Sequence, residues 1–295
     1  MNAPDRPGLT RHGPDSPLGW PDPCREPPPA ANLPFNRSVA NPARVYAYWL
    51  GGKDHYEADR VAAEDVIRLR PQVVQSARAN RRFLARVVQF LASERGIRQF
   101  LDIGTGLPAP GNTHEVAQQA APACRVVYVD NDPVVLARAR ALLTGTPPGS
   151  CDYVDADLRD PAKIVAEAGR TLYLSRPVAV LLLAILHLLP GADDPAGVVA
   201  TLAGRLARGS FLALSHLTAD LAPGPVGAAA AAYNTRASVP VTPRTHAQVS
   251  GLFGGLPLVA PGVVPVSEWR VPAGEAAQPC DLYGGVACVS RRGRR

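Results

Sequence analysis

Five short apolar segments alternate with helix-start signals along the middle of this 295-residue chain. Their nearly continuous apolar character is typical of strands that helices cover on both faces. The segments span residues 99–103, 126–130, 153–155, 178–183 and 211–215. A capping residue followed by proline favours a helix start, because proline is preorganised for the first helical position; this pair occurs at residues 41–42, 132–133, 160–161, 194–195 and 242–243. The alternation predicts an α/β fold with a doubly wound, mainly parallel sheet, whose ligands bind at the carboxyl ends of the strands.

The two ends of the chain differ in composition from this body. Residues 1–34 contain ten of the 31 prolines and show no apolar periodicity, so we expect a disordered leader. Residues 35–290 are expected to form one domain, with a helical lid over 41–92 and an α/β core over 96–290. Residues 291–295 form a basic tail that supplies most of the net charge of +6, so the body is close to neutral and we expect no nucleic-acid partner.

The chain after the fifth strand carries weaker signals. We expect residues 219–240 to be a linker or insertion and residues 242–253 to be a helix. Two late strands, over 258–264 and 283–289, are expected to pair as an antiparallel edge of the sheet.

Membrane and disulfide classes are disfavoured by two simple observations. The longest apolar run, over residues 178–189, is shorter than the roughly 20 residues that a membrane helix needs. Five cysteines without a C-x-x-C pair suit a reducing compartment better than a disulfide framework or a zinc site. We therefore expect a cytoplasmic protein with free thiols, no metal and no membrane partner; the sequence says nothing about its oligomeric state.

Acidic residues follow each of the first three predicted strands. Asp102 precedes a turn whose Gly104 and Gly106 allow the backbone to approach a ligand closely. Asp130 ends the second strand, where a carboxylate can bind a ribose diol. Asp157 follows the third strand and can accept a hydrogen bond from an adenine amino group, while the adjacent leucine packs on the ring. Together these positions predict a nucleoside site.

The glycine turn leaves two cofactors open. Residues 104–109 match the G-x-G-x-x-A pattern of dinucleotide sites, so NAD is a competitor. However, Pro108 and Pro110 remove N–H donors that a pyrophosphate would use, and Asp102 would repel a phosphate. S-adenosylmethionine carries a cationic sulfonium and no phosphate, so an acidic pocket favours it.

Seven stretches carry a resemblance to a known family: Asn41–Tyr46, Leu50–Asp54, Ala77–Arg81, Phe100–Pro108, Val126–Pro133, Ala156–Pro161 and Leu214–His216. They resemble the actinobacterial S-adenosyl methyltransferase family, which belongs to the class I S-adenosylmethionine-dependent methyltransferases and was formerly described as a domain of unknown function. The resemblance implies a Rossmann-like, mainly parallel seven-stranded sheet with one antiparallel strand, and a cofactor pocket that N-terminal helices cap.

The resemblance also assigns site residues by motif position. It places the methionine end of the cofactor at Asp102, Gly104, Thr105 and Gly106, the ribose at Asp130 and Asn131, and the adenine at Asp157 and Leu158. The segment Leu183–His187, which includes Ala184, would line the transfer site. The polar inner face of the lid would be formed by Tyr46, Lys53, Arg78, Asn80 and Arg81.

The expected reaction is a direct in-line methyl transfer to an unidentified, small-molecule acceptor. His187 and Tyr46 are the candidate catalytic residues, because His187 follows the fourth strand and imidazole titrates near neutral pH. His216, after the fifth strand, is a weaker candidate. Adenine nitrogen is disfavoured as the acceptor because the chain has no Asn-Pro-Pro-Tyr motif. The alternatives are a non-catalytic S-adenosylmethionine-binding or regulatory protein and an NAD-dependent oxidoreductase.

Overall fold

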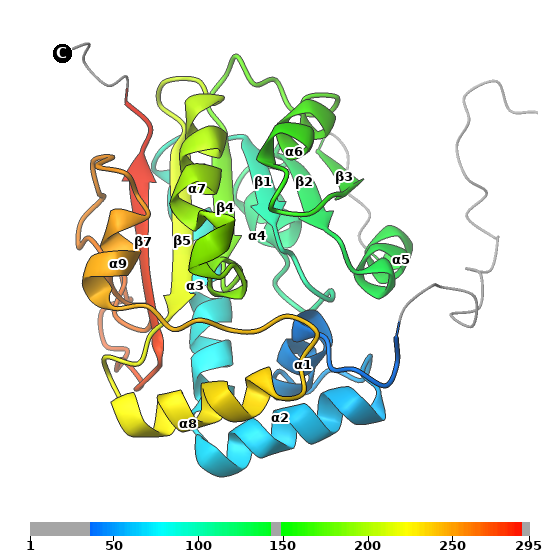
Figure 1. The fold of residues 1–295 in the computed structure, drawn as a ribbon. Helices are drawn as coiled ribbons and strands as arrows, with labels where there is room; N and C mark the ends of the chain where they lie inside the picture. The colour runs from blue at the N-terminus through cyan, green and yellow to red at the C-terminus, as the bar shows by residue number, and fades with distance from the viewer. Residues whose placement is uncertain (1–35, 143–148, 291–295) are drawn as a thin grey trace, which may run out of the picture. The chain divides into compact units, whose positions relative to one another are not determined.

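A seven-stranded sheet forms the centre of the protein (Figure 1), in the order β3-β2-β1-β4-β5-β7-β6. The computed structural model describes residues 36–142 and 149–290, so the predicted leader and basic tail lie outside the described residues. Strands β1 to β5 are parallel, and β7 runs antiparallel to its neighbours β5 and β6. The strands are β1 (Gln99–Ile103), β2 (Arg125–Asp130), β3 (Ser150–Asp155), β4 (Ala179–Leu183), β5 (Phe211–Leu217), β6 (Val264–Pro265) and β7 (Leu282–Cys288). This confirms the predicted mainly parallel sheet with one antiparallel strand.

Helices cover both faces of the sheet, which explains why its strands are apolar at successive positions. Alternate residues of a strand point to opposite faces: Phe100 packs with α3 (Val73–Ser93) and α4 (Thr113–Ala120), whereas Leu101 belongs to the cluster on the other face. That second face is covered by α6 (Pro161–Ala168), α7 (Pro195–Gly204) and α9 (His246–Gly251). No helix among the described residues combines the length and the apolar character needed to cross a membrane.

Four of the five predicted helix starts are confirmed. The side chain of Asn41 accepts a hydrogen bond from the backbone N–H of Ala43 at the start of α1 (Pro42–Trp49), and Asp160 and Asp194 cap α6 and α7 in the same way. Helix α5 (Pro133–Leu142) also begins at its predicted proline.

The predicted start at residues 242–243 is wrong. Helix α9 begins at His246, where Thr245 forms a capping box with Gln248. Thr242 lies instead in a segment without regular secondary structure, and its backbone N–H donates to the carbonyl of His187 at 2.8 Å. A long-range contact with the end of β4 therefore overrides the local helix signal.

Two further predictions for the C-terminal part need correction. The expected linker contains a helix, α8 (Pro223–Asn234), because its alanine run has high helix propensity and Val226, Ala229 and Tyr233 form a buried stripe. The expected strand over 258–264 is reduced to one bridge at Leu258 and the two residues of β6, since Pro261 and Gly262 interrupt the ladder.

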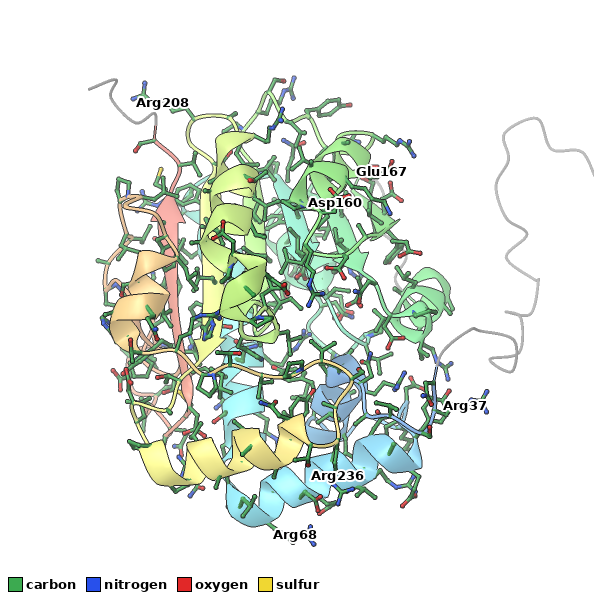
Figure 2. The ribbon with its side chains drawn as sticks, viewed as in Figure 1. Arg37, Arg68, Asp160, Glu167, Arg208 and Arg236 are labelled. Atoms are coloured by element: carbon green, nitrogen blue, oxygen red, sulfur yellow. The ribbon has the colours of Figure 1, made fainter. Side chains whose placement is uncertain are left out.

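Three helices lie across the carboxyl ends of the strands, and we call α1, α2 (Glu57–Leu69) and α8 the lid (Figure 1). Helix α2 packs along α8, although about 150 residues separate them in sequence. The lid thus differs from the predicted one: most of α3 packs on the sheet, and α8 joins from the C-terminal half. Figure 2 shows Arg68 at the lower edge of α2, where its side chain is 71% exposed, whereas Arg236, which follows α8, pairs with Asp65 of α2.

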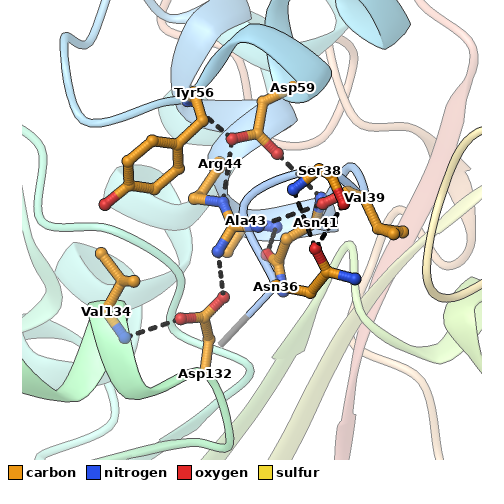
Figure 3. Close-up of polar contacts among 10 residues, drawn as sticks. All are labelled: Asn36, Ser38, Val39, Asn41, Ala43, Arg44, Tyr56, Asp59, Asp132 and Val134. Carbon is orange, nitrogen blue, oxygen red and sulfur yellow. Dashed lines mark hydrogen bonds and ion pairs between the residues drawn. The ribbon is translucent and has the colours of Figure 1, made fainter. Parts of the chain in front are cut away.

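A buried ionic cluster attaches the lid to the end of β2 (Figure 3). Arg44 of α1 is 2% exposed; its Nε donates to Asp59 Oδ2 of α2 at 2.9 Å and its Nη1 to Asp132 Oδ2 at 3.3 Å. Asp59 also accepts hydrogen bonds from the backbone N–H groups of Asn41 and Tyr56. One cation therefore holds two helices and the segment that follows β2.

Replacing Arg44 should test how much the lid depends on this cluster. Arg44→Met keeps side-chain length but leaves two buried carboxylates without their cation, so we expect the free energy of unfolding to fall by about 3–5 kcal/mol. Urea unfolding measures this value. The control is Arg60→Met, because Arg60 forms an exposed pair with Glu57 and such pairs contribute about 0–1 kcal/mol. Equal stabilities of the two variants would contradict the expectation.

Candidate active site

A cavity of about 250 Å³ lies between the carboxyl ends of the strands and the lid. All residues predicted from the sequence to bind the cofactor or to act in catalysis line it. They are Tyr46, Asn80, Arg81, Asp102, Gly104, Thr105, Gly106, Asp130, Asn131, Asp157, Leu158, Ala184 and His187. The fold therefore brings together residues from six separate segments, and their individual roles stay predictions.

Three residues considered in the sequence analysis lie elsewhere. Lys53 is exposed in the loop after α1, and Arg78 is exposed on the side of α3 that faces away from the cavity. His216 is fully buried within β5, one residue before its end, and does not line the cavity. Lys53 and Arg78 are therefore not part of the inner face of the lid, because the helical period turns Arg78 away from Asn80 and Arg81.

The glycine loop after β1 borders the cavity with its backbone. Gly104 and Gly106 have φ angles of 72° and 66°, a left-handed conformation that favours glycine. A Cβ atom at Gly104 would lie 2.5 Å from the side chain of Ile185, whereas one at Gly106 would meet no atom within 4 Å. Gly104 is thus required by close packing, and Gly106 by the turn beside the open cavity.

Asp130 organises the loops on either side of it. Its Oδ2 accepts a hydrogen bond from the N–H of Gly106 at 2.9 Å, and its Oδ1 accepts one from the N–H of Asp132 at 3.0 Å. Burial raises the pKa of Asp130 to about 6, although these hydrogen bonds oppose the shift. The side chain links the glycine loop to the segment that Arg44 holds.

Asp157 lies in a more open, polar part of the cavity. Its Oδ2 accepts a hydrogen bond from Asn131 Nδ2 at 2.9 Å and lies 3.2 Å from Nη1 of Arg159. Leu158 beside it is buried. An acidic group and an apolar side chain therefore occur side by side at the end of β3, as the sequence predicted.

Asp102 and Arg81 lie on the other side of the glycine loop. Asp102 is 5% exposed, its Oδ2 accepts a hydrogen bond from Thr113 Oγ1 at 2.6 Å, and burial raises its pKa to about 6. Arg81 donates to the carbonyls of Ala109, Pro110 and Gly111, the shortest contact being 2.9 Å to Gly111. Much of the hydrogen-bonding capacity of Arg81 is therefore used to hold the loop.

A chain of hydrogen bonds connects the lid to strands β4 and β5. Tyr46 Oη donates to the carbonyl of Ala77 at 3.0 Å and accepts from Asn80 Nδ2 at 3.1 Å. Asn80 Oδ1 accepts from Ser215 Oγ at 2.6 Å, and this hydroxyl accepts from the N–H of Ala184 at 2.9 Å. Burial raises the pKa of Tyr46, so its phenol stays protonated. Ser215 is not among the predicted site residues, although it lies within a stretch that carried the resemblance.

His187 lies in an environment that favours its neutral form. The N–H of Leu217 donates to His187 Nδ1 at 3.4 Å, and burial together with His216 and Arg244 holds the pKa of His187 well below 6.5. With Nδ1 as acceptor, the proton of the neutral ring is assigned to Nε2. The nitrogen that would act as a base is already paired, so His187 is better suited to donate a hydrogen bond.

His216 has a structural role. Its Nδ1 donates to the carbonyl of Leu217 at 2.7 Å, and its Nε2 accepts from Arg244 Nη1 at 2.7 Å. Burial lowers the pKa of His216 to about 4. Arg244 also donates to the carbonyls of Leu186 and Leu189, so the pair fixes the loop after β4. No local sequence signal marks Arg244, because all its partners are distant in the chain.

Comparison with known proteins identifies the family. A family model described as S-adenosyl methyltransferase matches residues 30–291. The chain belongs to this S-adenosyl methyltransferase family. Family membership confirms the predicted methyltransferase class and S-adenosylmethionine as the cofactor. A comparison with curated protein sequences gives no match.

Two solved structures show the same fold. A DUF574 family protein from Streptomyces avermitilis is 46% identical, with a TM-score of 0.81, and the match covers 85% of this chain and 97% of that one. A candidate methyltransferase from Thermobifida fusca is 38% identical, with a TM-score of 0.80 and coverage of 89% and 98%. Both sources are actinobacteria, which agrees with the resemblance found in the sequence.

The raised pKa of Asp102 should make the stability of this S-adenosyl methyltransferase depend on pH. A folded pKa of about 6 lies above the ordinary value of 3.8, so this group stabilises the fold below about pH 4 and loses that contribution as the pH rises through 6. Asp102→Asn cannot ionise. We therefore expect this variant to gain about 1–2 kcal/mol relative to the wild type between pH 5 and pH 7.5.

Thermal unfolding of the cofactor-free protein at several pH values measures the gain. Asp155→Asn is the matched control, because Asp155 is exposed at the end of β3 and lies outside the cavity lining. Its stability relative to the wild type should change little over this range. If the stability difference between Asp102→Asn and the wild type did not change with pH, the electrostatic argument would be wrong.

Proposed function

We propose that the protein uses S-adenosylmethionine to methylate a small-molecule acceptor by direct transfer within the cavity. One observation carries the proposal: the carboxylates at the carboxyl ends of β1, β2 and β3 line the same cavity as Tyr46 of the lid and Asn80 of α3. The predicted nucleoside site and the lid that excludes water thus border the same cavity.

The lining fits this cofactor in charge and in shape. The acidic residues Asp102, Asp130 and Asp157 suit a ligand that carries a positive sulfur, an amino group and hydroxyl groups but no phosphate. Asp102 and Asp130 have raised pKa values in the cofactor-free protein, so an arriving positive charge favours their ionised forms. The backbone of Gly106, which borders open space, allows a close approach to the ligand.

We assign the parts of the site by their order along the sheet. Asp102 and the loop 104–106 hold the methionine end, Asp130 and Asn131 hold the ribose diol, and Asp157 with Leu158 holds the adenine. The assignment is supported by the order β3-β2-β1, which places these groups in one row along the edge of the sheet. Arg81 supports the row from one end, because it donates to the carbonyls of Ala109 and Gly111 in the segment that follows the glycine turn.

The residues of the chain bind and orient the cofactor and the acceptor, and they exclude water from the cavity. When bound, S-adenosylmethionine supplies a methyl group on a positively charged sulfur. Tyr46 is held by Asn80 as a protonated phenol, and neutral His187 can donate from Nε2 to a polar group of the acceptor. Positioning of this kind is sufficient for a large part of the rate of an in-line displacement. His187 is therefore proposed as a group that orients the acceptor, and no protein base is required.

Removing the carboxylate of Asp130 tests the cofactor assignment. Charge-assisted hydrogen bonds contribute about 1.5–3 kcal/mol each, so Asp130→Ala should weaken binding of S-adenosylhomocysteine at least tenfold. Isothermal titration measures the affinity, with Asp155→Ala as the exposed control that should bind as the wild type does. NAD serves as the comparison ligand and should bind much more weakly.

The outcomes separate the hypotheses. Unchanged affinity in Asp130→Ala would overturn the ribose assignment. Tight binding of NAD without binding of S-adenosylhomocysteine would favour the oxidoreductase alternative. A wild-type protein that binds the cofactor but never converts it to S-adenosylhomocysteine, across a broad set of acceptors, would favour the non-catalytic alternative.

A further inference from the structure

The cavity extends beyond the residues predicted for the cofactor. Strands β3, β2 and β1 carry the three carboxylates, whereas β4, β5 and β7 occupy the other side of the sheet. On that side the lining is mainly apolar, with Ser76, His187 and Tyr233 among its polar members, and we call it the apolar half. It includes Val66, Leu188, Leu217, Val226, Ala230 and Leu282.

The lid closes the apolar half from above. Val66 of α2 and Val226 and Ala230 of α8 are each less than 10% exposed, and α2 and α8 pack together. Leu217 ends β5 and Leu282 begins β7, so the opposite wall consists of strand ends. Two parts of the chain that are distant in sequence thus enclose one apolar space, which is continuous with the proposed cofactor site.

The charges of the apolar half cancel. Of the described residues that line it, Arg70 and Asp281 are the charged ones, and they form a bidentate pair: Nη2 to Oδ1 at 2.7 Å and Nε to Oδ2 at 3.0 Å. Asp281 is 3% exposed, and its backbone N–H donates to Ser76 Oγ at 3.0 Å. The pair therefore presents no uncompensated charge to a ligand.

We propose that the apolar half binds the methyl acceptor, and that this acceptor is an uncharged, largely apolar small molecule. The inference rests on the proposed function and specifies its substrate class. A charged acceptor would lose its hydration without gaining a counter-ion, because the two charges present already satisfy each other. A sugar-like acceptor would leave most of its hydroxyl groups without partners against the apolar walls.

Asp281 sets this charge preference. Arg70 would attract an anion if it were not neutralised, because its guanidinium matches the geometry of a carboxylate. Asp281 occupies that geometry permanently. Asp281 is thus a specificity-determining residue that acts through Arg70.

The first test compares three probes that share a naphthalene ring and differ in charge. It uses the wild-type protein saturated with S-adenosylhomocysteine. The probes 2-naphthol, 2-naphthoate and 2-naphthylmethylamine are neutral, anionic and cationic at neutral pH. Isothermal titration should show that 2-naphthol binds at least tenfold more tightly than either charged probe. Equal or tighter binding of a charged probe, or no binding of 2-naphthol, would overturn the proposal. This test needs no variant.

A matched pair of variants tests the location. Ala230 lines the apolar half, and Ala231 follows it on the exposed face of α8. Ala230→Leu should weaken binding of 2-naphthol at least tenfold, whereas Ala231→Leu should leave it unchanged. Both variants should keep their affinity for S-adenosylhomocysteine. Unchanged probe binding in a folded Ala230→Leu protein would place the probe elsewhere and overturn the inference.

The third test shifts the preference between the neutral and the anionic probe. Asp281→Asn keeps the shape of the side chain but leaves Arg70 as an uncompensated cation, so the affinity for 2-naphthoate relative to 2-naphthol should rise at least tenfold. An unchanged ratio would overturn the role of Asp281. Titration with S-adenosylhomocysteine distinguishes a failure of the proposed function from a failure of the proposed acceptor class. Absence of S-adenosylhomocysteine binding in the wild type contradicts the proposed function, whereas cofactor binding without preference for the neutral probe contradicts only the acceptor class.

Discussion

The buried cation of Arg44 is the interaction on which the arrangement of the site depends. A guanidinium removed from water needs partners, and Arg44 finds them on α2 and on the segment after β2. Asp132, one of these partners, also donates its backbone N–H to Asp130, which in turn holds Gly106. The lid, the predicted ribose carboxylate and the glycine loop are therefore connected by one continuous set of polar contacts.

The electrostatic design of the cavity differs between its two sides. Asp102 and Asp130 lie at the ends of β1 and β2, and burial raises the pKa of both carboxyl groups. Ionising them without a nearby positive charge therefore costs free energy. Over β4, β5 and β7, the ionic groups are paired with each other and the imidazole of His187 is neutral. In the proposed arrangement, the carboxylates over β1 and β2 match the charge of the cofactor. The side over β4, β5 and β7 offers mainly apolar contacts.

The sequence predicted the parts of this protein that depend on local signals. Strand positions were readable because burial on both faces forces continuous apolar runs, and four helices begin where a capping residue precedes proline. Helix α8 was missed because its alanine run lacks a cap and a clear polar face. The roles of Arg244 and Ser215 could not be read from the sequence, since each depends on partners far along the chain. The partner of His187 Nδ1, the backbone N–H of Leu217, is also distant in the chain, so the hydrogen bonding of this ring could not be read from the sequence.

The lid is assembled from two parts of the chain, and this has a consequence for how such a protein can diversify. Helix α8 is inserted between β5 and β7, whereas the glycine loop and the carboxylates belong to the first half of the sheet. The cavity-facing residues of α8, Val226 and Ala230, are therefore separate in sequence from the groups predicted to hold the methyl donor. If the apolar half binds the acceptor as proposed, substitutions at these two positions offer a route to altered acceptor choice that leaves the sequence of the donor-binding motifs unchanged.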